Sequence, residues 1–337
     1  MRKIFYFILA FSLFSCKNDD TPDVSRIKVE LTVQRFEQDF FSADTNNILN
    51  ELQRLKGKYP SFLDDFTQQI LGFDNSTPPD SLTKYVHLFI RDYRFVKDSA
   101  DKIFTDFEPF ADEIKIGLQY VKHYFPQYKA PNKVITFIGP FDGYSDVITS
   151  DAFAVGLQLH LGSNFSFYKS DVSRDIFPDY ISTKFTPEYI SVNCIKNVVD
   201  DMYPDKSMGR ALIEQMVEKG KRLYLLDKFL PVTDEHLKIG YTERQLKDSY
   251  ANEAVIWDFF LANDLLNNAD QNIVKNYIGE SPKTQELGEG SPGNIGSFSG
   301  WQIVKKYMNK NPETTLPELM NKNAREIYSQ SKYKPRT

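Results

Sequence analysis

The spacing of hydrophobic and polar positions changes along the chain, and these changes predict its elements. Near residue 30, apolar Val29, Leu31 and Val33 alternate with polar neighbours, which predicts a half-buried strand. From about residue 47 to residue 125 the apolar positions recur at helical spacing, until Pro126 ends the last of these helices. The first third of the chain is therefore predicted to be one strand followed by helices.

Two further segments favour strands before helical spacing returns. Residues 134–138 form a short apolar run that Gly139 and Pro140 end, and residues 153–161 alternate. Within the second segment, His160 is opposite in phase to its leucine neighbours, so we expect its side chain to face away from the apolar side of the strand. Helices are predicted over residues 187–202, 207–226, 242–260 and 301–308.

Local start and stop signals support several of these helices. Ser61 with Asp64, and Thr242 with Gln245, have the spacing of capping boxes, and Gly72 stands where a helix would end. No internal repeat and no linker-like break interrupts the chain after its first segment. We expect a single domain over residues 27–330, of the α+β class, mainly helical with a small β-sheet. A glycine-rich loop should precede its last long helix, with glycines at Gly288, Gly290, Gly293 and Gly296.

Composition limits what such a domain can do. The chain is 41% hydrophobic and 26% charged, which is enough apolar material for a packed core. Its net charge of −5, without a basic stripe, argues against nucleic-acid binding. Aromatic residues make up 14% of the chain and are expected mainly in the core, although they also leave open a module that binds cell-wall fragments or small ligands.

The N-terminus has the layout of a lipoprotein signal peptide. Arg2 and Lys3 precede an apolar run over residues 4–14, and Leu-Phe-Ser stands directly before Cys16, as in a lipobox. A helical run of about 11 residues is about 16 Å long, too short for a hydrocarbon core of roughly 30 Å. We therefore predict a signal peptide over residues 1–15 that is removed, with Cys16 acylated as the new first residue.

Acylation of Cys16 would place the protein on a membrane of the cell envelope, with the inner and outer membranes both open. Two or more acyl chains hold a protein stably on a bilayer. The polar, proline-containing stretch over residues 16–26 is then expected to act as a tether between lipid and domain. Only Cys194 would remain as a free thiol, so no disulfide can form within the mature chain.

Sequence motifs for catalysis are missing. None of the four histidines has a second histidine four residues away, the spacing that aims two imidazoles from a helix at one metal. There is no G-x-S-x-G nucleophile motif, and the glycine-rich loop lacks the Lys-Ser/Thr ending of a phosphate-binding loop. Cys194 lies among apolar residues of a predicted helix, which is typical of a small buried side chain. We therefore expect no catalytic residue, no bound metal and no cofactor.

Several short segments, taken in their order along the chain, resemble GldB, the gliding-motility lipoprotein of Bacteroidota. The lipobox belongs to this pattern, and no single segment is diagnostic. The segments are Val33-Gln34-Arg35-Phe36, Phe177-Pro178-Asp179-Tyr180, Phe185-Thr186-Pro187-Glu188-Tyr189-Ile190, Gly220-Lys221-Arg222-Leu223-Tyr224, Asn252-Glu253-Ala254-Val255-Ile256-Trp257, Ser291-Pro292-Gly293-Asn294-Ile295-Gly296 and Gly300-Trp301-Gln302-Ile303-Val304.

The GldB family in turn resembles predicted zinc peptidases of the zincin type, which carry H-E-x-x-H on one helix and an acidic ligand on the next. The resemblance places Asn193, Cys194 and Asn197 at the first motif and Lys219 at the acidic position. Amides are poor zinc ligands, a thiol does not replace a carboxylate as general base, and Lys219 brings a positive charge. The resemblance thus implies a zincin-like helical domain whose metal site is degenerate.

The same resemblance implies a non-enzymatic, lipid-anchored envelope protein that supports gliding motility and its associated secretion machinery. Its partners would be the membrane, through the lipid, and other proteins of that machinery. An active metal-dependent peptidase with unorthodox ligands, such as His160 or Glu253, remains an alternative. Because mobile loops often carry function, partner contact is expected where the glycine-rich loop enters the last long helix. The residues expected there are Gly293, Gly296, Gly300 and Trp301.

Overall fold

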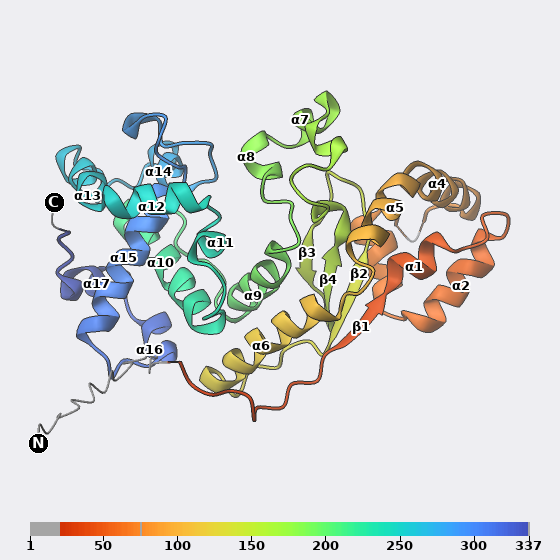
Figure 1. Cartoon of the computed structure of the whole chain (residues 1–337), viewed down its shortest axis with the longest axis horizontal. Coiled ribbons are helices and arrows are strands. Elements are labelled where there is room, and N and C mark those ends of the chain that lie inside the picture. The colour runs from red at the N-terminus through yellow and green to blue at the C-terminus, as the bar shows by residue number, and fades with distance from the viewer. Residues whose placement is uncertain (1–20, 75, 336–337) are drawn as a thin grey trace, which may run out of the picture.

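The computed structural model describes residues 21–74 and 76–335, and Figure 1 shows the whole chain. A four-stranded sheet has the order β1-β2-β4-β3, in which β2 pairs in parallel with both β1 and β4 while the edge strand β3 runs antiparallel to β4. The strands are β1 (Thr32–Arg35), β2 (Lys133–Phe137), β3 (Asp146–Ile148) and β4 (Ala152–Gly156).

Helices supply most of the remaining structure, which confirms the prediction of a mainly helical α+β fold with a small sheet. The helices before β2 are α1 (Phe36–Phe41), α2 (Ile48–Lys58), α3 (Phe62–Asp64), the π-helix η1 (Asp65–Ile70), α4 (Pro79–Asp92), α5 (Arg94–Ile103) and α6 (Glu108–Tyr124). After β4 come two 3₁₀ turns, η2 (Leu157–Leu159) and η3 (Ser166–Lys169), and then α7 (Asp171–Ile176), α8 (Asp179–Ser182), α9 (Tyr189–Met202) and α10 (Leu212–Phe229). The C-terminal part contains α11 (Glu235–Ile239), α12 (Glu243–Ala251), α13 (Glu253–Ala262), α14 (Gln271–Ile278), the 3₁₀ turn η4 (Gln285–Leu287), α15 (Ile295–Lys310), α16 (Leu316–Asn321) and α17 (Ala324–Ser331).

Figure 1 shows how these elements divide in space: the sheet and the N-terminal helices lie on one side, the C-terminal helices lie on the other, and α6 and α9 lie between them. One connected hydrophobic cluster nevertheless extends from Val24 to Tyr333. Aromatic rings fill much of its N-terminal part, where Phe36 and Phe66 are buried with ring centroids 4.7 Å apart. Rings in such tilted or edge-on contact add about 0.5–1.5 kcal/mol per pair beyond the burial of their surface.

The last long helix begins earlier than predicted and is buried. Gly296, Gly300 and Trp301, expected near a mobile contact loop, lie inside α15, and Trp301 has no exposed surface. The reason is the packing of α15 against α10: a Cβ atom on Gly300 would collide with the backbone carbonyl of Met216. The glycines therefore permit close approach of two helices, and Gly296, Gly300 and Trp301 are not a partner-binding surface.

The strand predicted over residues 153–161 is also shorter than expected. β4 ends at Gly156, and the chain continues as the 3₁₀ turn η2. All five residues of β4 are buried, because the strand is central in the sheet, between β2 and β3. Both faces of the strand are therefore buried, and alternating apolar positions do not mark its length. His160 lies beyond the strand and is 1% exposed, so the prediction that it belongs to the strand and faces away from the strand's apolar side is wrong.

Two of the predicted helices differ from the structure in their boundaries. The helix predicted from residue 207 begins at Leu212, and the helix predicted over residues 242–260 divides into α12 and α13 at Asn252. The capping box at Thr242 is present, whereas the side chain of Ser61 makes no capping hydrogen bond. Gly72 has a φ of +75° just after η1, the left-handed conformation typical of the residue that ends a helix.

The start of the described chain packs against the domain. Val24 is 6% exposed, the side-chain amide of Gln119 on α6 donates to the carbonyl of Ile27, and Lys122 donates to the carbonyl of Lys28. Val24, which falls within the predicted tether of residues 16–26, therefore packs against the domain. The predicted signal peptide and Cys16 lie outside the described residues, and within the described part no helix is both long and apolar enough to cross a membrane.

Candidate functional site

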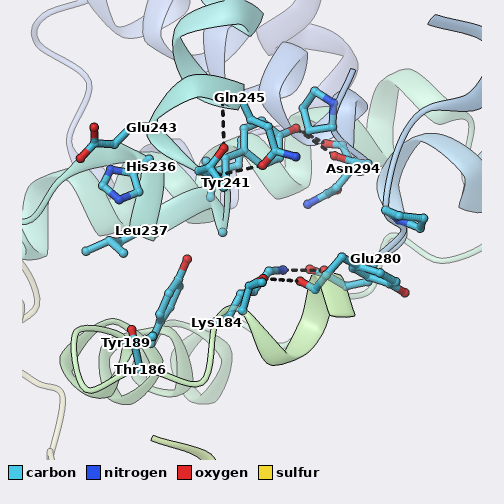
Figure 2. Close-up of a pocket in the computed structure, with 18 of the residues that line it drawn as sticks. Lys184, Thr186, Tyr189, His236, Leu237, Tyr241, Glu243, Gln245, Glu280 and Asn294 are labelled. Atoms are coloured by element: carbon cyan, nitrogen blue, oxygen red, sulfur yellow. Dashed lines mark hydrogen bonds and ion pairs between the residues drawn. The ribbon is translucent and has the colours of Figure 1, made fainter. Parts of the chain in front are cut away.

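A cleft of about 480 Å³ lies between the segment that joins α8 to α9 and the C-terminal helices (Figure 2). Its volume is within the range of about 300–1,000 Å³ that is typical of ligand-binding pockets. One wall carries Tyr180, Lys184, Thr186 and Tyr189, and the opposite wall carries His236, Leu237, Tyr241, Gln245, Glu280 and Asn294.

The wall formed by α11 and α12 is set by local turn chemistry. Gly240 ends α11 with a φ of +79°, a conformation that favours glycine, and the capping box of Thr242 and Gln245 then starts α12. Between them, the Tyr241 hydroxyl donates to the carbonyls of Gly293 and Asn294, at 3.0 and 3.2 Å. These contacts join α11, α12 and the start of α15 into one wall.

An ion pair connects the two walls. Lys184, before α9, lies 2.8 Å from the carboxylate of Glu280, after α14, as Figure 2 shows. A Cβ atom at Gly240 would lie only 3.2 Å from Lys184 Nζ, so the lysine passes close over this glycine. Burial, together with the charges of Glu188 and Glu280, raises the pKa of Tyr189 to about 12, so this cleft residue is a neutral phenol at physiological pH.

A buried polar cluster joins α9 to the edge strand β3 close to this cleft. The carboxylate of Asp146 accepts hydrogen bonds from His160 Nε2 at 2.9 Å and from Asn193 Nδ2 at 2.8 Å. Asn197 Nδ2 donates to the backbone carbonyl of Asp146 at 2.8 Å. His160 Nδ1 lies 3.0 Å from the carbonyl of Thr186, which is a cleft residue. We call Asp146, His160, Asn193 and Asn197 the α9–β3 cluster.

The surroundings of His160 favour its charged form. Burial alone lowers its pKa, but the charge of Asp146 and the hydrogen bonds to Asp146 and to the Thr186 carbonyl outweigh burial, so the pKa is raised. Both ring nitrogens face an oxygen acceptor, and only the imidazolium donates from both. The cluster is thus a buried His–Asp ion pair held by two amide donors from α9.

The four residues predicted to occupy a degenerate metal site have other contacts in the structure. Asn193 and Asn197 do share one face of α9, and their N–H groups are directed at Asp146. Cys194 is buried, and burial followed by the charge of Asp146 raises the pKa of its thiol well above the ordinary value. Lys219 lies on α10 and pairs with Asp205 at 3.0 Å.

The two unorthodox ligands considered from the sequence have other partners. His160 belongs to the α9–β3 cluster, and Glu253, at the start of α13, accepts a hydrogen bond of 2.7 Å from the Tyr333 hydroxyl. In residues 21–74 and 76–335, no three His, Cys, Asp or Glu side chains are grouped so that they could hold a metal ion.

Sequence reasoning found some of the site and missed the rest. Of the four expected contact residues, Gly293 alone lines the cleft. Lys184 and Glu280 were missed because their pairing joins segments 96 residues apart. Asp146 was missed because one carboxylate in a short edge strand carries no recognisable spacing. Its partner Asn193 is 47 residues away along the chain.

The site and the fold together describe a mainly helical α+β protein with a polar cleft beside a buried ion pair. The family model of gliding motility protein GldB matches residues 17–335, and the chain belongs to this family. No curated protein and no solved structure matches the chain.

Proposed function

We propose that this protein is a lipid-anchored component of the cell envelope that supports gliding motility and the associated secretion machinery by binding another component, without catalysis. Membership of the GldB family connects the chain to gliding motility. Cys16, preceded by its lipobox, supplies the anchor, and the cleft between α9 and the C-terminal helices supplies the binding surface.

One observation carries the non-catalytic part of the proposal: Asn193 and Asn197 on α9 donate to Asp146. An amide N–H is a donor and repels a cation, whereas a zinc ligand must offer a lone pair. The helix face that would hold two imidazoles in a zincin-type peptidase therefore serves to attach α9 to the edge strand. In this proposal the ancestral metal site is degenerate, and its remaining role is to stabilise the cleft wall at Thr186, whose carbonyl lies 3.0 Å from His160 Nδ1.

Site-specific crosslinking in living cells tests the binding role. A photoreactive amino acid replaces Leu237, which lines the cleft, and a matched chain carries it at Val232, five residues earlier and 87% exposed. The expected result is a crosslink from position 237 to a protein of the gliding or secretion machinery, with none from position 232. Equal crosslinking from both positions would contradict a role for the cleft.

Two further measurements test the anchor and the chemistry. Cys16→Ala should move the protein from the membrane fraction to the soluble fraction and remove the lipid mass, since the acyl chains provide the attachment.

Metal analysis of the purified chain should find far less than one zinc per molecule, and chelators should change neither its stability nor its crosslinks. About one tightly bound zinc per chain, with chelator-sensitive peptide cleavage, would instead establish a peptidase.

A further inference from the structure

A second recess, of about 200 Å³, adjoins the cleft and has a different chemistry. It shares Ile239, Glu280 and Asn294 with the cleft, so the two spaces have a common wall. Its lining brings together four basic side chains from three helices, and we call it the basic recess. These side chains are Lys196 on α9, Lys219 and Arg222 on α10, and Lys238 on α11.

Three of the four cations are paired with carboxylates. The ion-pair distances are 3.0 Å for Lys219 with Asp205, 3.4 Å for Arg222 with Asp200, and 3.3 Å for Lys238 with Asp227. The shared-wall carboxylate, Glu280, is paired with Lys184. Each of these cations, Lys184 included, is therefore neutralised by a carboxylate.

Lys196 supplies an additional positive charge. It is half-buried, and it forms no ion pair with any residue that the structure describes. Burial and the nearby ammonium of Lys184 lower its pKa to about 8, against the opposing influence of Glu280 and Asp200. An anion that approaches Lys196 stabilises its charged ammonium form, because the anion offsets both the burial of the ammonium and its repulsion from Lys184.

We propose that the basic recess binds a side-chain carboxylate of an acidic peptide segment that lies in the adjoining cleft. This inference rests on the proposed function, since it names the chemistry of the partner that the cleft receives. The recess is small enough to suit one acidic side chain. The cleft beside it offers Tyr180, Tyr189 and Leu237 to the remainder of the segment, and the common wall lets one extended chain reach both.

A binding experiment on the full chain in detergent tests this inference. The probe is a fluorescent hexaglutamate peptide, with hexaglutamine as its uncharged counterpart and inorganic phosphate as a free anion. Lys196→Gln removes the charge and keeps most of the side-chain length, and Lys196→Arg restores the charge. Lys102→Gln removes an exposed lysine from α5, a helix that lines neither the cleft nor the basic recess.

We expect hexaglutamate to bind, with at least ten-fold loss of affinity in Lys196→Gln, recovery in Lys196→Arg and less than two-fold change in Lys102→Gln. Bound hexaglutamate should also protect Lys196, and not Lys102, from acetylation measured by mass spectrometry. Hexaglutamine should neither bind nor protect.

Three results would overturn the inference: no binding of hexaglutamate, unchanged affinity in Lys196→Gln, or protection of Lys196 by phosphate alone, which would identify a free-anion site. None of these results bears on crosslinking from position 237 or on zinc content, so the proposed function succeeds or fails separately.

Discussion

At the scale of single residues, the charge of His160 makes the stability of the folded state depend on pH. Its pKa is raised above the ordinary value of 6.5, mainly through Asp146, despite burial. The folded protein therefore holds this proton more tightly than the unfolded chain does. The stabilisation is complete below about pH 6.5, the unfolded value, and is lost as the pH rises through the higher folded pKa.

The raised pKa of folded His160 predicts how the stability of a His160 variant should depend on pH. The free energy of unfolding of the wild type should exceed that of His160→Gln most at pH 6, and the difference should shrink as the pH rises to 9. Urea denaturation at four pH values measures it, with His123→Gln as the control for an exposed histidine. A difference that grows with pH would show that the folded protein prefers neutral His160.

Asp146 should be the most sensitive carboxylate of the site. In Asp146→Asn, the imidazolium loses its buried counter-ion, and an amide NH2 group replaces the Oδ1 atom that lies 3.1 Å from His160 Nε2. Removing one partner of a buried ion pair costs about 3–5 kcal/mol. We expect a loss of about 3 kcal/mol in the free energy of unfolding by urea at pH 7.

A matched control for Asp146 lies five residues further along the chain. Asp151 pairs with Lys133 at 2.6 Å, but its side chain is 39% exposed. Exposed ion pairs contribute about 0–1 kcal/mol, so Asp151→Asn should change the stability by less than about 1 kcal/mol. Similar losses of unfolding free energy in Asp146→Asn and Asp151→Asn would mean that the buried His160–Asp146 pair contributes no more than the exposed Lys133–Asp151 pair.

At the scale of elements, the close packing of α10 and α15 holds the C-terminal part together. A Cβ atom at Gly300 would overlap the carbonyl of Met216, and a Cβ atom at Gly220 would overlap the carbonyl of Gly300. Both obstacles are backbone atoms, which cannot move aside as a side chain can. Trp301 follows directly, and its indole N–H donates to Asp227 on α10 at 2.8 Å.

Gly300→Ala should therefore separate the two helices and destabilise the protein by about 3 kcal/mol or more, the upper range for overpacked sites. Gly57→Ala is the control, because Gly57 is on α2 and a Cβ atom there meets nothing within 4 Å. Alanine is the better helix former by about 1 kcal/mol, so Gly57→Ala should be neutral or stabilising. Thermal and urea unfolding of both variants measure the contrast.

The elements also show what the sequence could predict. Helices with one apolar face and a clear stop, such as α6 before Pro126, were found because their spacing reflects burial on one side. β4 and α15 were misplaced because they are buried nearly all round, so their apolar positions do not mark one face. The glycines of α15 looked like a loop because a close helix contact and a turn both favour glycine, and spacing alone does not separate the two.

The site was harder to predict than the fold for a related reason. The shared face of Asn193 and Asn197 follows from helical spacing and was correct. Their hydrogen-bond partner Asp146 comes from a strand, and His160, which pairs with Asp146, comes from the turn after another strand. The Lys184–Glu280 pair joins residues on either side of the cleft. Such contacts depend on how the elements pack, which no local pattern encodes.

At the scale of the whole molecule, the cleft and the anchor should be separable in function. Leu237→Glu places a charge inside the cleft, where it would disturb a bound partner. Val232→Glu places the same charge on an 87% exposed position five residues earlier. Val232→Glu should therefore alter the free energy of unfolding by less than about 1 kcal/mol. Leu237 is partly buried and packs against the hydrophobic cluster, so the free energy of unfolding of Leu237→Glu is measured as well.

We expect Leu237→Glu to abolish or strongly reduce colony spreading while the protein stays in the membrane fraction at wild-type abundance. Val232→Glu should spread normally. Loss of spreading with equal loss of abundance would point to misfolding, which the unfolding measurements detect. Normal spreading by a stable, membrane-bound Leu237→Glu protein would remove the cleft from the mechanism, and the partner surface would then have to lie on another face of the domain.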